Sequence, residues 1–365
     1  MEKAEYDLIV VGAGPAGSAC AITASRSGAK VLLLEKDRLP RHKVCGEFVS
    51  PESLSLLGSL VGEKRFASNP KINSARIFYG AKVISLAIAP AAQSIPRFDL
   101  DAALLQTARD NGVQTEERAA VREVVSGELF QVRTSTPSSE KTYSAKAVVN
   151  ASGRWSQLTQ FPHGNQKWIG LKAHFCEAAP PGSVDLYFFE GGYCGVQAVG
   201  PNAVNASAMV RADTARSLDE VFSKNAELWR RSRDWEQLFN PITTSPLYFR
   251  RPETKDKGMF LVGDAAGFID PFAGDGISLA LHSGQLAAHC IVPFLQGTCS
   301  LERAHQQYQA SHSKRLAPAF RNAARVRMLL SAPSFIRSML LSLAGTKPFS
   351  RALVRRTRIL TTDFH

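Results

Sequence analysis

The sequence lacks the cysteine and histidine patterns that mark structural metal sites and dithiol redox centres. No two of its cysteines form a Cys-x-x-Cys pair, and no group of histidines has metal-ligand spacing. Internal repeats and low-complexity linkers are absent as well. No signal peptide precedes the first apolar run, so we expect a reduced, cytoplasmic setting. The six cysteines are Cys20, Cys45, Cys176, Cys194, Cys290 and Cys299.

Acidic residues are missing between positions 303 and 362, a stretch that holds 12 of the 44 lysines and arginines. The rest of the chain balances 32 basic against 32 acidic residues, so the whole net charge of +12 lies in this segment. Pro333 interrupts its apolar runs, and Arg337 argues against a membrane-spanning helix. Two interpretations remain: a helical subdomain packed on the core, or peripheral contact with an anionic membrane face. Nucleic acid is not an expected partner, because no recognition motif accompanies the charge.

An apolar run at residues 6–11 leads into Gly-x-Gly-x-x-Gly, a small-residue stretch, and a second apolar run ending at Glu35. This order predicts a strand, a tight turn, a helix and a second strand. Gly12 permits the turn, Gly14 lets a pyrophosphate approach the backbone, and Gly17 lets the helix pack on the strand. The helix N-terminus offers N–H groups to phosphates, and Glu35 can accept from a ribose hydroxyl. The predicted dinucleotide contacts are Gly12, Ala13, Gly14, Pro15, Ala16, Gly17, Glu35 and Lys36.

A second fingerprint lies about 250 residues later, where an apolar run at 259–262 enters Gly263-Asp264 and then a glycine-flanked helix start. Together the two fingerprints resemble those of the FAD-dependent oxidoreductases built like para-hydroxybenzoate hydroxylase. The resemblance implies that FAD is bound and that Asp264 hydrogen-bonds its ribityl chain. It also implies that N–H groups at the helix start face the flavin pyrimidine edge, where negative charge collects on reduction. The contacts it adds are Gly263, Asp264, Pro271, Gly274, Asp275, Gly276 and Ile277.

Residues 43–47 read Lys-x-Cys-Gly-Glu, which resembles the geranylgeranyl reductase branch of this superfamily. The resemblance implies that this loop lies near the flavin, that Arg97 reaches the FAD phosphates, and that Val121 touches adenine through its backbone. Cys45 is a candidate proton donor or a small cavity-lining residue. Glu47 could orient the loop or act as a general acid, and an ion pair with Lys43 or an arginine is the favoured role. The further predicted contacts are Arg41, Cys45, Gly46, Arg97 and Val121.

Three departures from related patterns narrow the chemistry. Ser152-Gly153 stands where the hydroxylases usually carry Asp-Gly, so a direct NADPH contact at this turn is not carried over. The Trp-x-Trp-x-Ile-Pro run of flavin-dependent halogenases is absent, which argues against halogenation. The aromatic segment of the prenyl reductases is kept only at residues 191–193 and continues with Cys194, Gly195, Val196 and Gln197. A prenyl substrate is therefore not assumed.

We predict an α/β fold, with a glutathione-reductase-like Rossmann FAD-binding domain, an inserted mixed β-sheet substrate domain and a helical C-terminus. The FAD-binding domain is expected to be discontinuous, at residues 1–75, 97–155 and 255–300, because its two fingerprints must meet in space. Residues 76–96 and 156–254 would form the substrate domain, whose alternating apolar pattern predicts a sheet over the flavin. Residues 301–365 would form the basic helical C-terminal segment.

The predicted enzyme is an FAD-dependent monooxygenase acting on a lipophilic or aromatic small molecule of secondary metabolism. It would hydroxylate or epoxidise through a flavin C4a-hydroperoxide, with molecular oxygen as co-substrate and NAD(P)H as donor, directly or through a partner reductase. One alternative is a carbon–carbon double-bond reductase like geranylgeranyl reductase. A further alternative is a membrane-surface module whose FAD is structural.

Overall fold

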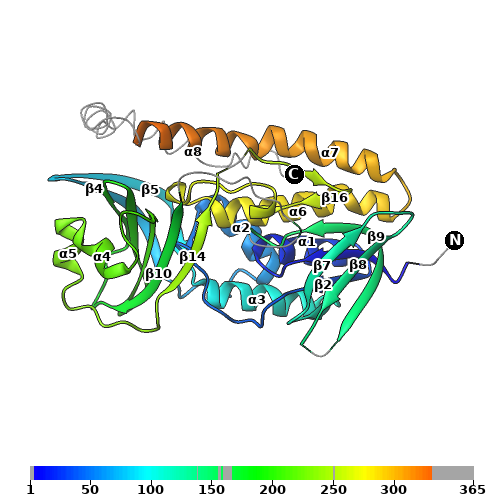
Figure 1. Ribbon diagram of the computed structural model, residues 1–365, viewed down its shortest axis with the longest axis horizontal. Helices are drawn as coiled ribbons and strands as arrows, with labels where there is room; N and C mark the ends of the chain where they lie inside the picture. Colours follow the sequence, from blue (N-terminus) through cyan, green and yellow to red (C-terminus); the bar gives the residue numbers. More distant parts are fainter. Residues whose placement is uncertain (1–3, 138, 155–157, 159–166, 250, 331–365) are drawn as a thin grey trace.

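The predicted strand, turn, helix and strand open the structure, a computed structural model that describes residues 4–137, 139–154, 158, 167–249 and 251–330 (Figure 1). β1 (Tyr6–Val11) and β2 (Val31–Leu34) pair in parallel, joined by α1 (Pro15–Arg26). β2 is buried along its length, as expected for a parallel strand covered on both faces. The predicted Rossmann-like unit is confirmed.

The first sheet has the order β15-β16-β9-β1-β2-β6, with the β7–β8 hairpin joined to β9. β9 (Glu140–Asn150) pairs in parallel with β1 through its second half and antiparallel with β8 through its first half. One strand thereby connects the parallel sheet to the hairpin. The other strands are β6 (Gln114–Glu116), β7 (Ala120–Val125), β8 (Phe130–Ser135), β15 (Lys255–Asp256) and β16 (Met259–Leu261).

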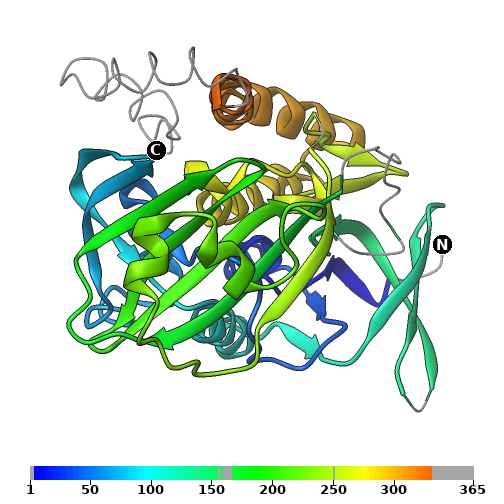
Figure 2. The ribbon, with the colours of Figure 1, turned by 60° about the vertical axis from the view of Figure 1, so that its left-hand side comes forward.

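The second sheet has the order β14-β10-β13-β12-β11-β4-β5-β3 and is mixed, because β11 and β4 pair in parallel while the other described pairs are antiparallel. Its outer face is covered by α4 (Leu218–Ser223) and α5 (Ala226–Arg231) (Figure 2). The predicted boundary between the FAD-binding and substrate domains, after residue 75, falls inside β4. The strands are β3 (Phe48–Val49), β4 (Lys71–Tyr79), β5 (Lys82–Ser94), β10 (Trp168–Cys176), β11 (Ser183–Phe189), β12 (Gly192–Gly200), β13 (Ala203–Arg211) and β14 (Ile242–Leu247).

Between the sheets, α1 packs on α6 (Gly276–Leu295) at backbone distance. A Cβ atom on Gly284 would lie 2.0 Å from the Ala16 carbonyl oxygen, so only glycine allows this approach. Among the described residues, α6 alone is long and apolar enough to cross a membrane, but 72% of its most apolar 18-residue window is buried inside the protein. α6 is therefore a core helix. It begins in the second fingerprint and packs on α1, the helix of the first. The neighbouring helices are α2 (Pro51–Val61) and α3 (Arg97–Asp110).

α7 (Leu301–Arg315) and α8 (Ala317–Leu330) run lengthwise over this core (Figure 1). The Tyr308 hydroxyl donates to the Leu261 carbonyl at 2.8 Å, and the His305 ring stacks on Phe260 at 3.7 Å between centroids. The beginning of the basic segment therefore packs on the core. The stretch predicted to contact a membrane, residues 320–360, begins within α8, and its larger part lies in residues 331–365, outside the described residues.

Candidate active site

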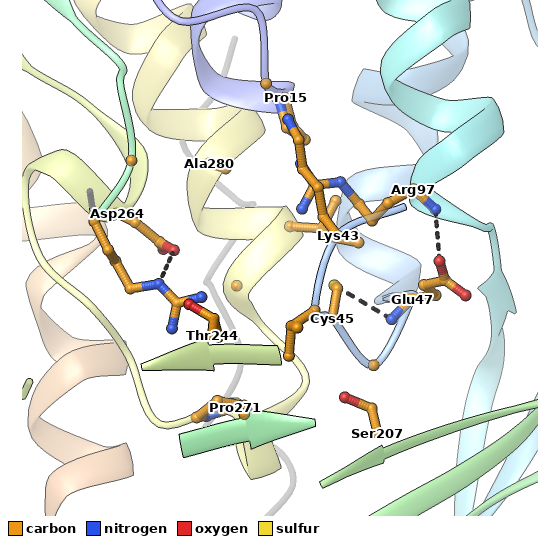
Figure 3. A pocket seen from close by; sticks show the side chains of 18 of the residues that line it. Pro15, Lys43, Cys45, Glu47, Arg97, Ser207, Thr244, Asp264, Pro271 and Ala280 are labelled. Carbon is orange, nitrogen blue, oxygen red and sulfur yellow. Dashed lines mark hydrogen bonds and ion pairs between the residues drawn. The ribbon is translucent and has the colours of Figure 1, made fainter. Parts of the chain in front are cut away.

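A cavity of about 940 Å³ lies between the two sheets. Its walls are the glycine turn, the loop at residues 41–48, the segment 263–277 and the inner face of the second sheet (Figure 3). All the predicted cofactor contacts line it except Ala13 and Gly17, which lie behind the turn. The two candidate catalytic residues, Cys45 and Glu47, border it as well.

The glycines of the first turn have separate roles. Gly12 has φ +105°, and a Cβ atom there would lie 2.4 Å from the Ala151 carbonyl oxygen. A Cβ atom on Gly17 would lie 1.9 Å from the Gly12 carbonyl oxygen, so this glycine serves packing. Gly14 is open, since the nearest atom to its added Cβ is Arg97 Nη2 at 3.8 Å. No side chain caps α1, which leaves its first N–H groups available to an anion.

Glu35 ties the end of β2 to this turn. Its Oε2 atom accepts from the Ala13 N–H at 2.9 Å, and its Oε1 atom accepts from the Asp37 N–H at 3.1 Å. The side chain is buried while lining the cavity. Glu35 therefore fixes the turn in addition to standing where a ribose acceptor was predicted.

Asp101, which the sequence analysis missed, gathers two cations at the cavity. Arg97 donates to both of its oxygens, through Nε at 2.7 Å and Nη2 at 2.8 Å, and Lys43 Nζ lies 2.8 Å from Oδ2. Burial raises the pKa of the Asp101 carboxyl, but the charges of Arg97 and Lys43 outweigh it and bring the pKa to about 2. The i, i+4 spacing of Arg97 and Asp101 on one helix is the signal that could have identified this pair.

Glu47 connects the motif loop to the second sheet. Oε1 accepts from the Arg97 backbone N–H at 2.8 Å and from Lys172 Nζ, while Oε2 lies 2.7 Å from His174 Nε2. The predicted ion-pair partner was wrong: Lys43 binds Asp101, and β10 supplies the partners of Glu47. Burial opposes ionisation of Glu47, but the His174 hydrogen bond and the Lys172 charge prevail and lower its pKa.

Cys45 lies two residues before Glu47, and its Sγ accepts from the Glu47 N–H at 3.3 Å. The side chain is half-buried and faces the cavity (Figure 3). Glu47 itself has φ +60°, a left-handed conformation that is uncommon outside glycine. The contacts of the Glu47 carboxylate hold this turn, and with it the position of Cys45.

Asp264 stands at the second fingerprint, opposite the glycine turn. Arg154 Nε lies 3.5 Å from its Oδ2 atom, and the Arg154 guanidinium lies 4.3 Å from the centroid of the Phe268 ring. Burial raises the pKa of the Asp264 carboxyl and lowers that of the Arg154 guanidinium. Arg154 was not predicted; its place directly after Ser152-Gly153 was the one available signal.

Comparison with known families decides the assignment. The model of the family described as pyridine nucleotide-disulphide oxidoreductase matches residues 6–196. The chain belongs to this family. It is an FAD-dependent oxidoreductase, and the resemblance drawn from its sequence motifs is confirmed.

Relatives of this oxidoreductase include reductases. It is 25% identical to menaquinone reductase of Mycolicibacterium smegmatis, covering 90% of this chain and 86% of that protein. It is 27% identical to digeranylgeranylglycerophospholipid reductase of Methanocella arvoryzae, covering 84% and 83%. Solved structures of similar fold include a brominase and a hydroxylase. A flavin-dependent brominase variant gives a TM-score of 0.80 at 20% identity, covering 97% and 94% of the two chains. Anhydrotetracycline hydroxylase from Streptomyces rimosus gives 0.75 at 18% identity, covering 96% and 75%.

The residues of this flavoprotein cavity fit FAD. The open Gly14 and the uncapped start of α1 suit a pyrophosphate, and Arg97 and Lys43 add positive charge beside them. α6 begins at Gly276, which lines the same cavity, and it has no side-chain cap, so its first N–H groups are open to an acceptor. These features come from both fingerprints and meet in one space.

We expect Asp264→Ala to weaken FAD binding more than Asp275→Ala does. Both residues line the cavity, but Asp264 is predicted to bind the ribityl chain through its carboxylate, whereas Asp275 is buried in a turn expected to act mainly through backbone N–H groups. Losing a charge-assisted hydrogen bond costs about 1.5–3 kcal/mol, or roughly tenfold to a hundredfold in affinity. FAD dissociation constants of the two variants provide the measurement, and equal values would contradict the assignment.

Proposed function

We propose that this FAD-dependent oxidoreductase is a monooxygenase of a lipophilic or aromatic small molecule, with NAD(P)H as electron donor, directly or through a partner reductase. One observation carries the proposal: beside Cys45, β12 presents Gly195 and Gln197 to the cavity in place of the aromatic residues of the prenyl reductases. The similarity in fold to a hydroxylase supports it.

Bound FAD would supply the electron transfer and the activation of oxygen. The chain itself supplies position and electrostatics. Asp101 fixes Arg97 and Lys43 where the phosphates are expected, so that two cations stand ready without reorganisation. With FAD bound, the start of α6 would direct N–H groups toward the ring, and the apolar strands of the second sheet would keep water from the substrate.

A second candidate is a double-bond reductase. Cys45 favours it, because this thiol faces the cavity where an acid must protonate the carbon that does not receive hydride. The two reductases among the relatives favour it as well.

Isotope labelling separates the two reactions. FAD-loaded protein is supplied with NADPH, oxygen-18 gas and either 1-naphthol or geranylgeraniol. The masses of the products are then measured by mass spectrometry. A monooxygenase is expected to add one labelled oxygen atom to the naphthol. A reductase would add two hydrogen atoms to the prenyl alcohol, with or without oxygen, and this result would replace the proposal.

Cys45→Ala provides an independent test. Under the monooxygenase proposal the thiol only lines the cavity, so the variant is expected to retain most of its oxygenation rate. A reductase that uses Cys45 as general acid would lose about a hundredfold or more. Cys176→Ala, a half-buried thiol at the end of β10, is the matched control. A hundredfold loss confined to Cys45→Ala would argue for the reductase.

A further inference from the structure

The side chains on the inner face of the second sheet differ in polarity from one group of strands to the next. On β11, β4 and β5 the side chains facing the cavity are apolar: Val184, Leu186, Phe188, Ala75, Ile77, Leu86 and Ile88. On β12 and β13 two polar side chains, Gln197 and Ser207, join the lining beside Tyr193 and Met209. Gln197 stands opposite Asn205 and next to Val184 in register, and Ser207 stands opposite Gly195. A polar strip therefore borders a lipophilic wall.

Gln197, which lines the cavity, has unused hydrogen-bonding capacity. Its Nε2 atom donates to the Ser94 hydroxyl at 2.7 Å, and Ser94 is fully buried, so one end of the amide is held. The side chain is only 2% exposed, yet within the described residues its Oε1 atom has no hydrogen-bond partner. A buried acceptor left unpaired is costly, so a group entering the cavity is the natural partner.

Asn205 fixes the position of the polar strip relative to the Cys45 loop. Its Nδ2 atom donates to the Cys45 carbonyl at 3.0 Å, which anchors the motif loop to β13. Its Oδ1 atom is likewise buried and unpartnered in the part of the chain that the structure describes. Ser207, on the same strand, lies below the Cys45 loop in Figure 3. Polar groups thus gather where the loop and the sheet meet.

We propose that Gln197 is a specificity-determining residue that accepts a hydrogen bond from a hydroxyl or N–H group of the substrate. The substrate is then an amphiphile: its donor group lies at the polar strip beside Cys45, and its apolar body lies against β11, β4 and β5. This inference rests on the proposed function and defines the substrate class of the same site. A site built to bind a donor discriminates strongly against an analogue that lacks it.

Paired probes test the proposal without turnover. FAD-loaded wild type is titrated with 1-naphthol and with its methyl ether, 1-methoxynaphthalene, and binding is followed through the flavin absorbance. We expect naphthol to bind about tenfold more tightly than the ether. In Gln197→Leu, naphthol affinity should fall about tenfold while ether affinity holds, so that the ratio approaches one. Gln197→Met, with the same expected outcome, serves if the leucine variant folds poorly.

Val184→Ala is the matched control, because it shortens the apolar neighbour of Gln197 in register. It should weaken both probes alike and keep their ratio. Equal or unmeasurable affinities of the two probes in wild type would overturn the proposal, as would an unchanged ratio in both Gln197 variants. Since no oxygen is transferred in this assay, a failed labelling experiment and a failed discrimination experiment remain distinguishable.

Discussion

Gly14→Glu is expected to yield a folded protein that purifies with little or no FAD. The position tolerates a side chain, because an added Cβ meets only Arg97 Nη2, at 3.8 Å. A carboxylate there would repel the pyrophosphate and also draw Arg97 away from it. Two like charges about 4 Å apart near a protein surface repel by about 4 kcal/mol, which corresponds to roughly a thousandfold in affinity. The measurement is the ratio of flavin to protein absorbance, with the thermal midpoint as the check on folding.

Two neighbouring substitutions make this result interpretable. Gly14→Ala adds bulk without charge, so its FAD loss should be intermediate. Gly17→Ala should destabilise the protein itself, since its Cβ would lie 1.9 Å from the Gly12 carbonyl oxygen. Normal FAD content in Gly14→Glu would refute the placement of the pyrophosphate at this turn.

Glu47→Leu is expected to lower the free energy of unfolding by about 3–5 kcal/mol, because it leaves the Lys172 ammonium buried without its counter-charge. The double variant Glu47→Leu/Lys172→Met removes both charges and should regain most of this loss. Urea unfolding of the wild type, both single variants and the double variant gives the coupling between the two residues. Equal destabilisation by the single and double changes would show that the pair is not coupled.

The ionisation of Glu47 makes the free energy of unfolding depend on pH. The pKa of Glu47 is lower in the folded protein than its unfolded value of about 4.3. Its contribution is therefore fully present above the unfolded pKa and is lost as pH falls through the folded pKa. The stability advantage of wild type over the double variant should accordingly shrink below about pH 4.

Local chemistry explains what the sequence could predict. Gly12, Gly14 and Gly17 are demanded by a turn whose parts lie within six residues, so their pattern survives any tertiary setting. The helix start near Gly276 could be predicted from the sequence for the same reason. Local patterns locate helix starts better than helix ends. The Ser217 and Glu220 spacing is that of a capping motif, and Ser217 accepts from the Glu220 N–H at the start of α4, but the end of α4 at Ser223 follows from the new cap at Asn225.

Contacts between distant strands explain what was missed. Glu47 was assigned a partner from its own loop, whereas Lys172 and His174 reach it from β10, more than 120 residues away. Their inward direction depends on the register of β10 with β13, which no single segment encodes. Gly170 shows the same dependence: its added Cβ would lie 2.8 Å from Val44, so its role follows only from the loop packed against it.

The backbone contact between α1 and α6 also sets the order of events at the ribosome. The glycine turn and Ala16 leave the exit tunnel early, but Gly284, whose missing side chain admits Ala16, follows more than 260 residues later. At the elongation rates of cells, the nascent chain spends many seconds with its first nucleotide-binding turn made and its covering helix not yet synthesised. Stable capture of the flavin must then wait for the synthesis of α6, and until then the first nucleotide-binding turn stays open to chaperones and proteases.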